Sequence, residues 1–88
     1  MKIKNGFVVR EIAGQSIVVA LGEASKAFNG MINLNETGRV IWDLLAKGAE
    51  VEDIVTALLS EYEVDRETAK ADVEKFVKTL AEANILES

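Results

Sequence analysis

The pattern of hydrophobic residues changes near residue 35, and this change constrains the fold more than any other feature of the sequence. Before it, β-branched and aromatic residues form short runs at 7–12 and 16–21, which are typical of strands. After it, apolar residues recur at intervals of three and four, the period of a helix. A chain of 88 residues has room for one small core, so residues 1–88 are expected to form a single domain.

The first half of the chain is expected to form a small antiparallel sheet. The connection Ala13–Gln15 contains a glycine that can adopt a positive φ, and it joins the first two runs as a hairpin. The polar stretch 22–29 is expected to be a loop, in which Phe28 closes the edge of the core. The turn dipeptide Asn29-Gly30 then leads to a third strand at Met31–Leu34.

The third strand is the most informative binding element in the sequence. Alternation places Ile32 and Leu34 on one face of it, and Met31 and Asn33 on the other. Because it comes last in the set, one side of its backbone is expected to lack a partner strand. Two interpretations stay open at this point: the last helix shields this edge, or the edge accepts an added strand from a partner.

The second half predicts three helices. Asn35 is a suitable N-cap for the first, which ends at Gly48, and Asp65 caps the last, over about residues 66–83, with Asn84 after its end. The expected apolar stripes are Val40, Ile41, Leu44 and Leu45; Val51, Ile54, Val55, Leu58, Leu59 and Tyr62; and Ala69, Val73, Phe76, Val77, Leu80 and Ala83. Three strands followed by three helices give a small α+β domain.

Composition excludes several functions. The chain has no Cys and no His, so disulfides, thiolate metal sites and the commonest general base are excluded. Ten basic residues against fifteen acidic ones give a net charge of −5, which disfavours binding to nucleic acid. No apolar run approaches the length of a membrane span, and the first residues lack the apolar core of a signal peptide. We therefore expect a cytoplasmic protein.

A search for catalytic or metal-binding groups finds no convincing site. The carboxylates fall at exposed helix positions or in first turns, whereas a catalytic pair must be buried. Glu50, Glu52 and Asp53 lie close in sequence but lack the spacing and central glycine of a calcium loop. Trp42 is expected to belong to the core. The sequence thus predicts a binding protein that is not an enzyme and that has no metal and no cofactor.

One segment carries a resemblance to a known family. Residues 30–45 contain Leu-Asn-Glu-Thr-Gly and then Ile-Trp-Asp-Leu-Leu. This segment resembles the signature of the PqqD family, small proteins named for pyrroloquinoline quinone biosynthesis protein D. The resemblance continues at Val51–Ile54, Glu61–Asp65 and Leu80–Leu86, and so covers nearly the whole chain.

The resemblance implies a winged-helix-like fold, with a three-stranded antiparallel sheet followed by a three-helix bundle. It also implies a non-catalytic recognition element for ribosomally synthesised, post-translationally modified peptides. Such domains bind the leader segment of a precursor peptide and present it to a modifying enzyme, often a radical SAM protein. The leader resembles an added strand, antiparallel to the third strand and beside the last helix, which is consistent with the edge strand that the sequence predicts by itself.

Carried onto this chain by position, the resemblance implies a peptide-binding site with two sides. Its residues are Met31, Ile32, Asn33 and Leu34 in the third strand, and Asp72, Lys75, Phe76 and Thr79 on the last helix. Phe76 is assigned equally to the core or the groove. Lys75 and Lys78 are candidates for contacts with acidic leader residues, although a solvated helix face is the favoured explanation for any single lysine. Residues 35–38 are better explained as the start of a helix, with Gly38 packed close to the sheet.

Two other classes of function remain as alternatives. One is a structural or assembly subunit without a peptide ligand. The other is a winged-helix DNA-binding regulator, which is disfavoured because residues 65–84 hold five acidic and four basic side chains. The sequence leaves open which precursor and pathway are involved, and whether the protein is a monomer or a homodimer.

Overall fold

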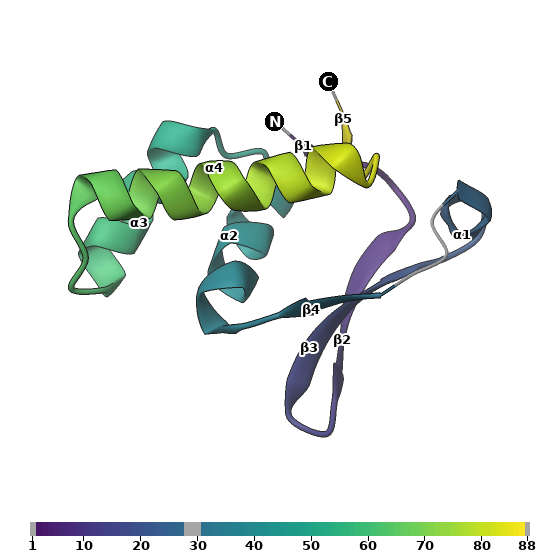
Figure 1. Cartoon of the computed structure of the whole chain (residues 1–88). Coiled ribbons are helices and arrows are strands. Elements are labelled where there is room, and N and C mark those ends of the chain that lie inside the picture. Colours follow the sequence, from purple (N-terminus) through teal and green to yellow (C-terminus); the bar gives the residue numbers. More distant parts are fainter. Residues whose placement is uncertain (1, 28–30, 88) are drawn as a thin grey trace.

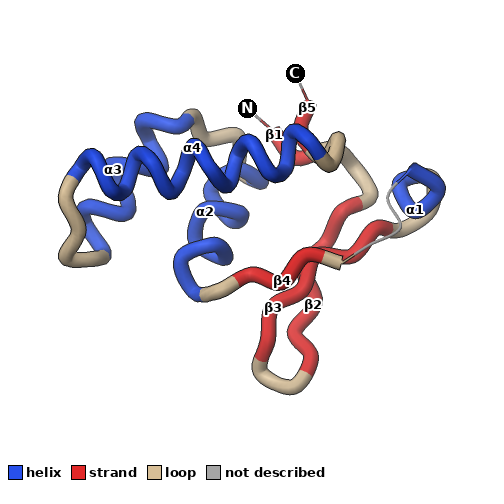
Figure 2. The backbone as a smooth tube through the Cα atoms, viewed as in Figure 1, coloured by secondary structure: helices blue, strands red, loops and turns tan. Residues whose placement is uncertain are grey.

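The change of pattern near residue 35 marks the boundary between the three-stranded sheet and the three long helices of the structure. A computed structural model describes residues 2–27 and 31–87. Its elements are β1 (Lys2–Ile3), β2 (Phe7–Ile12), β3 (Gln15–Ala20), α1 (Ala24–Ala27), β4 (Ile32–Leu34), α2 (Glu36–Ala46), α3 (Val51–Glu61), α4 (Arg66–Glu82) and β5 (Leu86–Glu87). The α+β class is confirmed, with the antiparallel sheet β2-β3-β4 followed by the three main helices (Figure 1, Figure 2).

The β2–β3 hairpin has a tighter turn than the sequence predicted. Ala13 and Gly14 both adopt positive φ, of 53° and 80°, and Ile12 pairs directly with Gln15. Two consecutive residues with positive φ form the turn whose twist matches that of the flanking strands. The expected three-residue connection was therefore wrong by one residue, and Gln15 is the first residue of β3.

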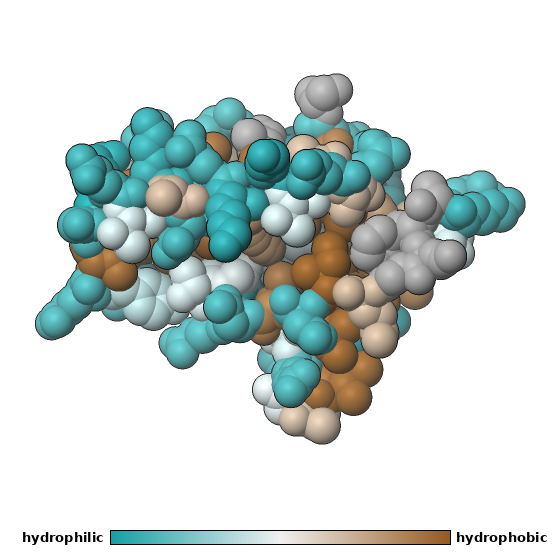
Figure 3. Space-filling model, viewed as in Figure 1, coloured by the Kyte–Doolittle hydropathy of each residue, from teal (hydrophilic) through white to brown (hydrophobic). Residues whose placement is uncertain are grey.

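The third strand of the sheet is at its edge. β4 pairs antiparallel with β3, with Ser16 opposite Leu34 and Val18 opposite Ile32, and it begins one residue later than predicted. Val18 and Leu34 are buried in the core, which confirms the expected orientation of Leu34. Hydrophobic side chains gather on the surface over the sheet, below α4 in this view (Figure 3).

The ends of the main helices follow the predicted capping residues. The Asn35 side chain accepts a hydrogen bond from the Gly38 N–H at 2.7 Å, and Asp65 accepts one from the Thr68 N–H at 2.8 Å. Asn84 follows α4, as predicted, and has a left-handed conformation with a φ of 62°. In the described part of the chain, no helix is long and apolar enough to cross a membrane.

The core lies where α2, α3 and α4 meet the sheet. Trp42 is 4% exposed, so its assignment to the core is confirmed. The other buried core residues are Val18, Leu34, Ile41, Leu45, Ile54, Val55, Leu58, Ala69, Val73, Leu80 and Ile85. They include members of each predicted helical stripe, and they fix the rotation of α4 relative to β4.

Two features of the fold were not predicted. The short helix α1 lies inside the segment 22–29 that was expected to be a loop, and it begins where the Ser25 hydroxyl donates to the Gly22 carbonyl at 2.7 Å. Strands β1 and β5 pair near the two ends of the chain, because the turn at Asn84 brings the last residues back beside the first (Figure 1). The expectations for Phe28 and for the Asn29-Gly30 turn lie outside the described residues.

Candidate functional site

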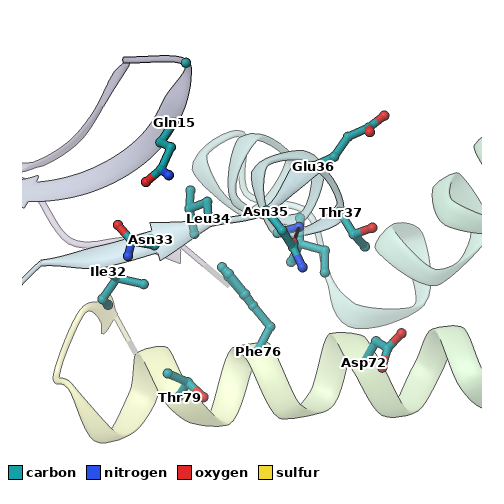
Figure 4. A pocket seen from close by; sticks show the side chains of 13 residues that line it. Gln15, Ile32, Asn33, Leu34, Asn35, Glu36, Thr37, Asp72, Phe76 and Thr79 are labelled. Carbon is teal, nitrogen blue, oxygen red and sulfur yellow. Dashed lines mark hydrogen bonds between the residues drawn. The ribbon is translucent and has the colours of Figure 1, made fainter. Parts of the chain in front are cut away.

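A groove of about 830 Å³ lies between the edge strand β4 and the helix α4 (Figure 4). The start of α2 closes one end, and the tip of the β2–β3 hairpin contributes to the lining. The lining residues are Gly14, Gln15, Ile32, Asn33, Leu34, Asn35, Glu36, Thr37, Gly38, Ile41, Asp72, Phe76 and Thr79. The predicted strand and helix walls therefore face a common hollow.

The direction of the free backbone groups on β4 follows from the hairpin. A two-residue turn makes Ile12 and Gln15 a hydrogen-bonded pair, and the bond from the Leu21 N–H to the Gly6 carbonyl at 2.7 Å continues this alternation. The even-numbered residues of β3 therefore direct their backbone groups toward β4, where they meet Ile32 and Leu34. The N–H and C=O of Asn33, between them, point away from β3 to the open edge.

The wall formed by α4 presents one flank of the helix. Asp72, Phe76 and Thr79 lie three and four residues apart, so they share one side of it. Phe76 reaches from α4 toward Leu34, Thr79 lies near Ile32, and Asp72 lies toward Thr37 (Figure 4). Phe76 is half-buried, packs against the core and also lines the groove, so the two alternatives for this residue are both true of the structure.

The residues at the start of α2 cap this helix and also line one end of the groove. A Cβ atom at Gly38 would lie 3.1 Å from Asn35 Oδ1 and 3.7 Å from Leu34 Cδ2. The close approach to the Asn35 side chain explains the glycine, and the distance to Leu34 is that of ordinary packing against the sheet. Residues 35–38 were interpreted as helix-start chemistry alone, but they also line the groove.

The charges in the groove are acidic. Among its lining residues, only Glu36 and Asp72 are charged, and both are exposed. Within the described ranges, neither carboxylate forms an ion pair with a basic side chain. The basic side chain nearest along α2 is Arg39, which donates to Asp43 at 3.1 Å and to Glu11 at 3.3 Å.

A second, smaller hollow of about 480 Å³ shares Glu36 with the groove. It is also lined by Glu61 and Tyr62 at the end of α3. Burial raises the pKa of the Tyr62 hydroxyl, and the carboxylates of Glu36 and Glu61 raise this pKa further. The acidic character of the groove thus continues past the start of α2.

The structure places the other candidate acids in structural roles. Glu50 and Asp53 form a capping box at the start of α3, and Glu52 pairs with Arg66 at 3.0 Å and with Lys70 at 3.8 Å. In the part of the chain that the structure describes, no three acidic side chains are grouped closely enough to hold a metal ion. These residues are therefore explained by helix capping and surface ion pairs.

Six of the eight predicted site residues come together in the groove. They are Ile32, Asn33, Leu34, Asp72, Phe76 and Thr79. Met31 lies just before β4 with 68% of its surface exposed, and Lys75 is exposed on α4; neither lines the groove. The lining residues that the sequence missed are at the hairpin tip and in α2, and only the register of β3 against β4 brings the hairpin tip near.

The chain matches a known protein family over most of its length. A family model described as Coenzyme PQQ synthesis protein D (PqqD) matches residues 9–86. A comparison with curated protein sequences gives no significant match.

Two solved structures have a similar chain. One is TbiB1 in complex with the TbiA(beta) leader peptide, at 33% sequence identity and a TM-score of 0.80, covering 100% of this chain and 96% of that one. The other is lasso peptide synthetase B1 complexed with the leader peptide, at 23% identity and a TM-score of 0.78, covering 99% of this chain and 96% of that one. At this lower identity, the second likeness concerns the fold alone.

Proposed function

Since this chain belongs to the PqqD family, we propose that it is a non-catalytic adaptor that binds the leader segment of a ribosomally made precursor peptide. It presents that precursor to a modifying enzyme, such as a radical SAM protein. The similar TbiB1 chain comes from a structure that contains a leader peptide, which supports a peptide as the ligand here. We also propose that residues 1–88 act as one recognition domain in the cytoplasm.

The observation that carries this proposal is the open edge of β4 beside the groove. Asn33 directs its N–H and C=O away from β3, and the groove beside them has room for an extended chain. An extended peptide satisfies such groups by adding a strand to the sheet. The edge would otherwise be an exposed template for unwanted pairing.

The two sides of the groove would contribute differently to the bound state. Hydrogen bonds from β4 to the leader backbone hold any extended peptide, with little dependence on its sequence. Phe76, Leu34 and Ile41 supply an apolar lining that favours a peptide with an apolar anchor residue. Holding the leader in one register would fix the position of the segment that the enzyme modifies.

An amide-shift titration by NMR tests this proposal. The labelled protein is titrated with the leader half of a precursor peptide encoded beside it. We expect saturable shifts along residues 31–35 and 70–80, because these segments form the two walls. Two further peptides carry N-methyl groups at odd or at even positions. Only alternate N–H groups of an added strand face β4, so one of these peptides is expected to lose binding and the other to retain it.

The possible outcomes separate the classes of function. Equal binding of both N-methylated peptides would contradict strand addition. No saturable shifts with any peptide at about 0.5 mM, a concentration well above a micromolar Kd, would contradict the adaptor role. Saturable shifts along α4 with a short DNA duplex would support the regulator instead, although the net charge of −5 disfavours it.

A further inference from the structure

The charge at one end of the groove indicates which leader sequences it accepts. Asp72 lies one turn before Phe76 on α4, and Glu36 follows Leu34 by two residues at the start of α2. Both residues lie beyond Phe76 and Leu34, toward the α2 end of the groove, and the Glu36 side chain points away from α4 (Figure 4). In the described segments, no basic side chain lines the groove to neutralise them.

The neighbouring hollow extends this acidic region. Besides Glu36, it is lined by Glu11, Asp43 and Glu61 against the single basic residue Arg39. Arg39 is already engaged, because it donates to Asp43, to Glu11 and, at 3.1 Å, to the Ser16 hydroxyl. A peptide that passes this end of the groove meets an excess of negative charge, which favours a cation there.

The direction of the leader determines which of its residues meets this charge. β4 runs from Ile32 at the Thr79 end to Leu34 at the α2 end. A leader that is antiparallel to β4 therefore enters at the α2 end, so its residues near Asp72 precede those near Phe76. Four residues of a helix rise about 6 Å, and two residues of a strand span nearly the same distance.

We propose that the leader carries a lysine or arginine two residues before the apolar residue that contacts Phe76, that Asp72 selects this basic residue, and that Glu36 adds to the negative charge at this end of the groove. The inference rests on the proposed function and adds the chemistry of the ligand. Alternation places the basic and the apolar side chain on the same side of the leader, facing α4. A leader with an acidic residue in place of this lysine or arginine would be repelled by the carboxylate of Asp72.

The test compares three leader peptides that differ at this single position, with Lys, Gln or Glu. We expect the Lys peptide to bind about three times more tightly than the Gln peptide, and the Glu peptide about three times more weakly, as for exposed charge pairs at low salt. These differences are expected to shrink at about 0.3 M salt, where such pairs are screened. The Asp72→Lys variant is expected to reverse the order of the Lys and Glu peptides.

Glu74→Lys is the matched control, since it makes the same change in net charge on α4 outside the groove lining. An effect confined to Asp72→Lys supports a local contact, whereas an equal effect in both variants overturns the proposal in favour of overall charge. Equal, saturable binding of all three peptides also overturns it, and leaves the adaptor role standing. Binding of none of them contradicts the adaptor role itself.

Discussion

The two walls of the groove present different groups to a bound chain. β4 is three residues long, and its free backbone groups at Asn33 lie at the edge of the sheet. α4 presents side chains of three chemical types, from Asp72, Phe76 and Thr79. Backbone hydrogen bonds depend little on the sequence of a bound peptide, whereas side chains distinguish one peptide from another. Affinity and selectivity are therefore expected to respond to changes on different elements.

Changing the backbone of β4 is expected to have the largest effect. Asn33→Pro removes the outward N–H and leaves the β3–β4 hydrogen bonds in place, because those involve Ile32 and Leu34. A leader carbonyl that loses this partner is left unsatisfied, so we expect leader binding about 30-fold weaker, equivalent to about 2 kcal/mol. Isothermal titration calorimetry measures this change for several leader sequences, all of which should be weakened alike.

Asn33→Ala is the control for this variant, since it removes the side chain and keeps the N–H. We expect this variant to bind the leader within about twofold of the wild type. The Asn33 side chain is exposed, and any hydrogen bond that it makes to the leader in contact with water would contribute little. If both variants lose binding equally, the Asn33 side chain rather than the backbone holds the leader. In that case the contrast between the two walls disappears.

The apolar part of the α4 wall is expected to have the next largest effect. Phe76→Ala removes the ring that reaches toward Leu34, so we expect a leader with an apolar anchor to bind about tenfold more weakly. Because Phe76 also packs on the core, the free energy of unfolding should fall by about 2 kcal/mol, which urea denaturation measures.

Phe76→Leu separates the two roles of this residue. Leucine keeps an apolar side chain in the core, so most of the lost stability should return. It lacks the ring of Phe76, so the contact with the apolar anchor of the leader should stay weakened. A leader whose anchor is replaced by serine should bind the wild type and Phe76→Ala equally. A tenfold difference that persists with the serine leader would place the anchor elsewhere.

The sequence predicted the elements and their caps because these depend on local patterns. Asn35 and Asp65 have side chains that accept hydrogen bonds from the first turn of a helix, and Asn84 tolerates a left-handed conformation. The β1–β5 pair depends instead on a meeting of the two chain ends, which no local pattern encodes. The hairpin turn was predicted one residue too long, because alanine rarely adopts the positive φ that Ala13 has in the two-residue turn.

The α4 wall was only partly predictable, because small rotations of a helix decide which side chains reach a groove. Taking Val73 as the direction of the core, Phe76, Asp72 and Thr79 lie at about 60°, 100° and 120° to one side of the helix, and Lys75 at about 160°. The apolar stripe indicated which flank faces β4. The width of the groove, which excludes Lys75, depends on the distance between α4 and β4, and only the structure gives that.

Crowding the far end of the α4 wall is expected to have a moderate effect. Thr79 is exposed, lines the groove near Ile32, and donates its hydroxyl to the Lys75 carbonyl at 3.0 Å within its own helix. Thr79→Arg places a long side chain over the path of the leader, so we expect about fivefold weaker binding, within the range of overpacking costs. Thr79→Ser is the control and should bind like the wild type.

The smallest effect is expected at Lys75, which adjoins Phe76 in sequence but does not line the groove. Lys75→Ala preserves the helix, since alanine is a strong helix former, and removes only an exposed charge. We expect leader binding within about twofold of the wild type, as for other solvent-exposed charges. Calorimetry compares the leader affinity of Lys75→Ala with that of Phe76→Ala, a truncation at the adjacent position. A loss as large as that of Phe76→Ala would mean that the leader covers a broader face of α4, and that selectivity is distributed around the helix and not confined to one flank.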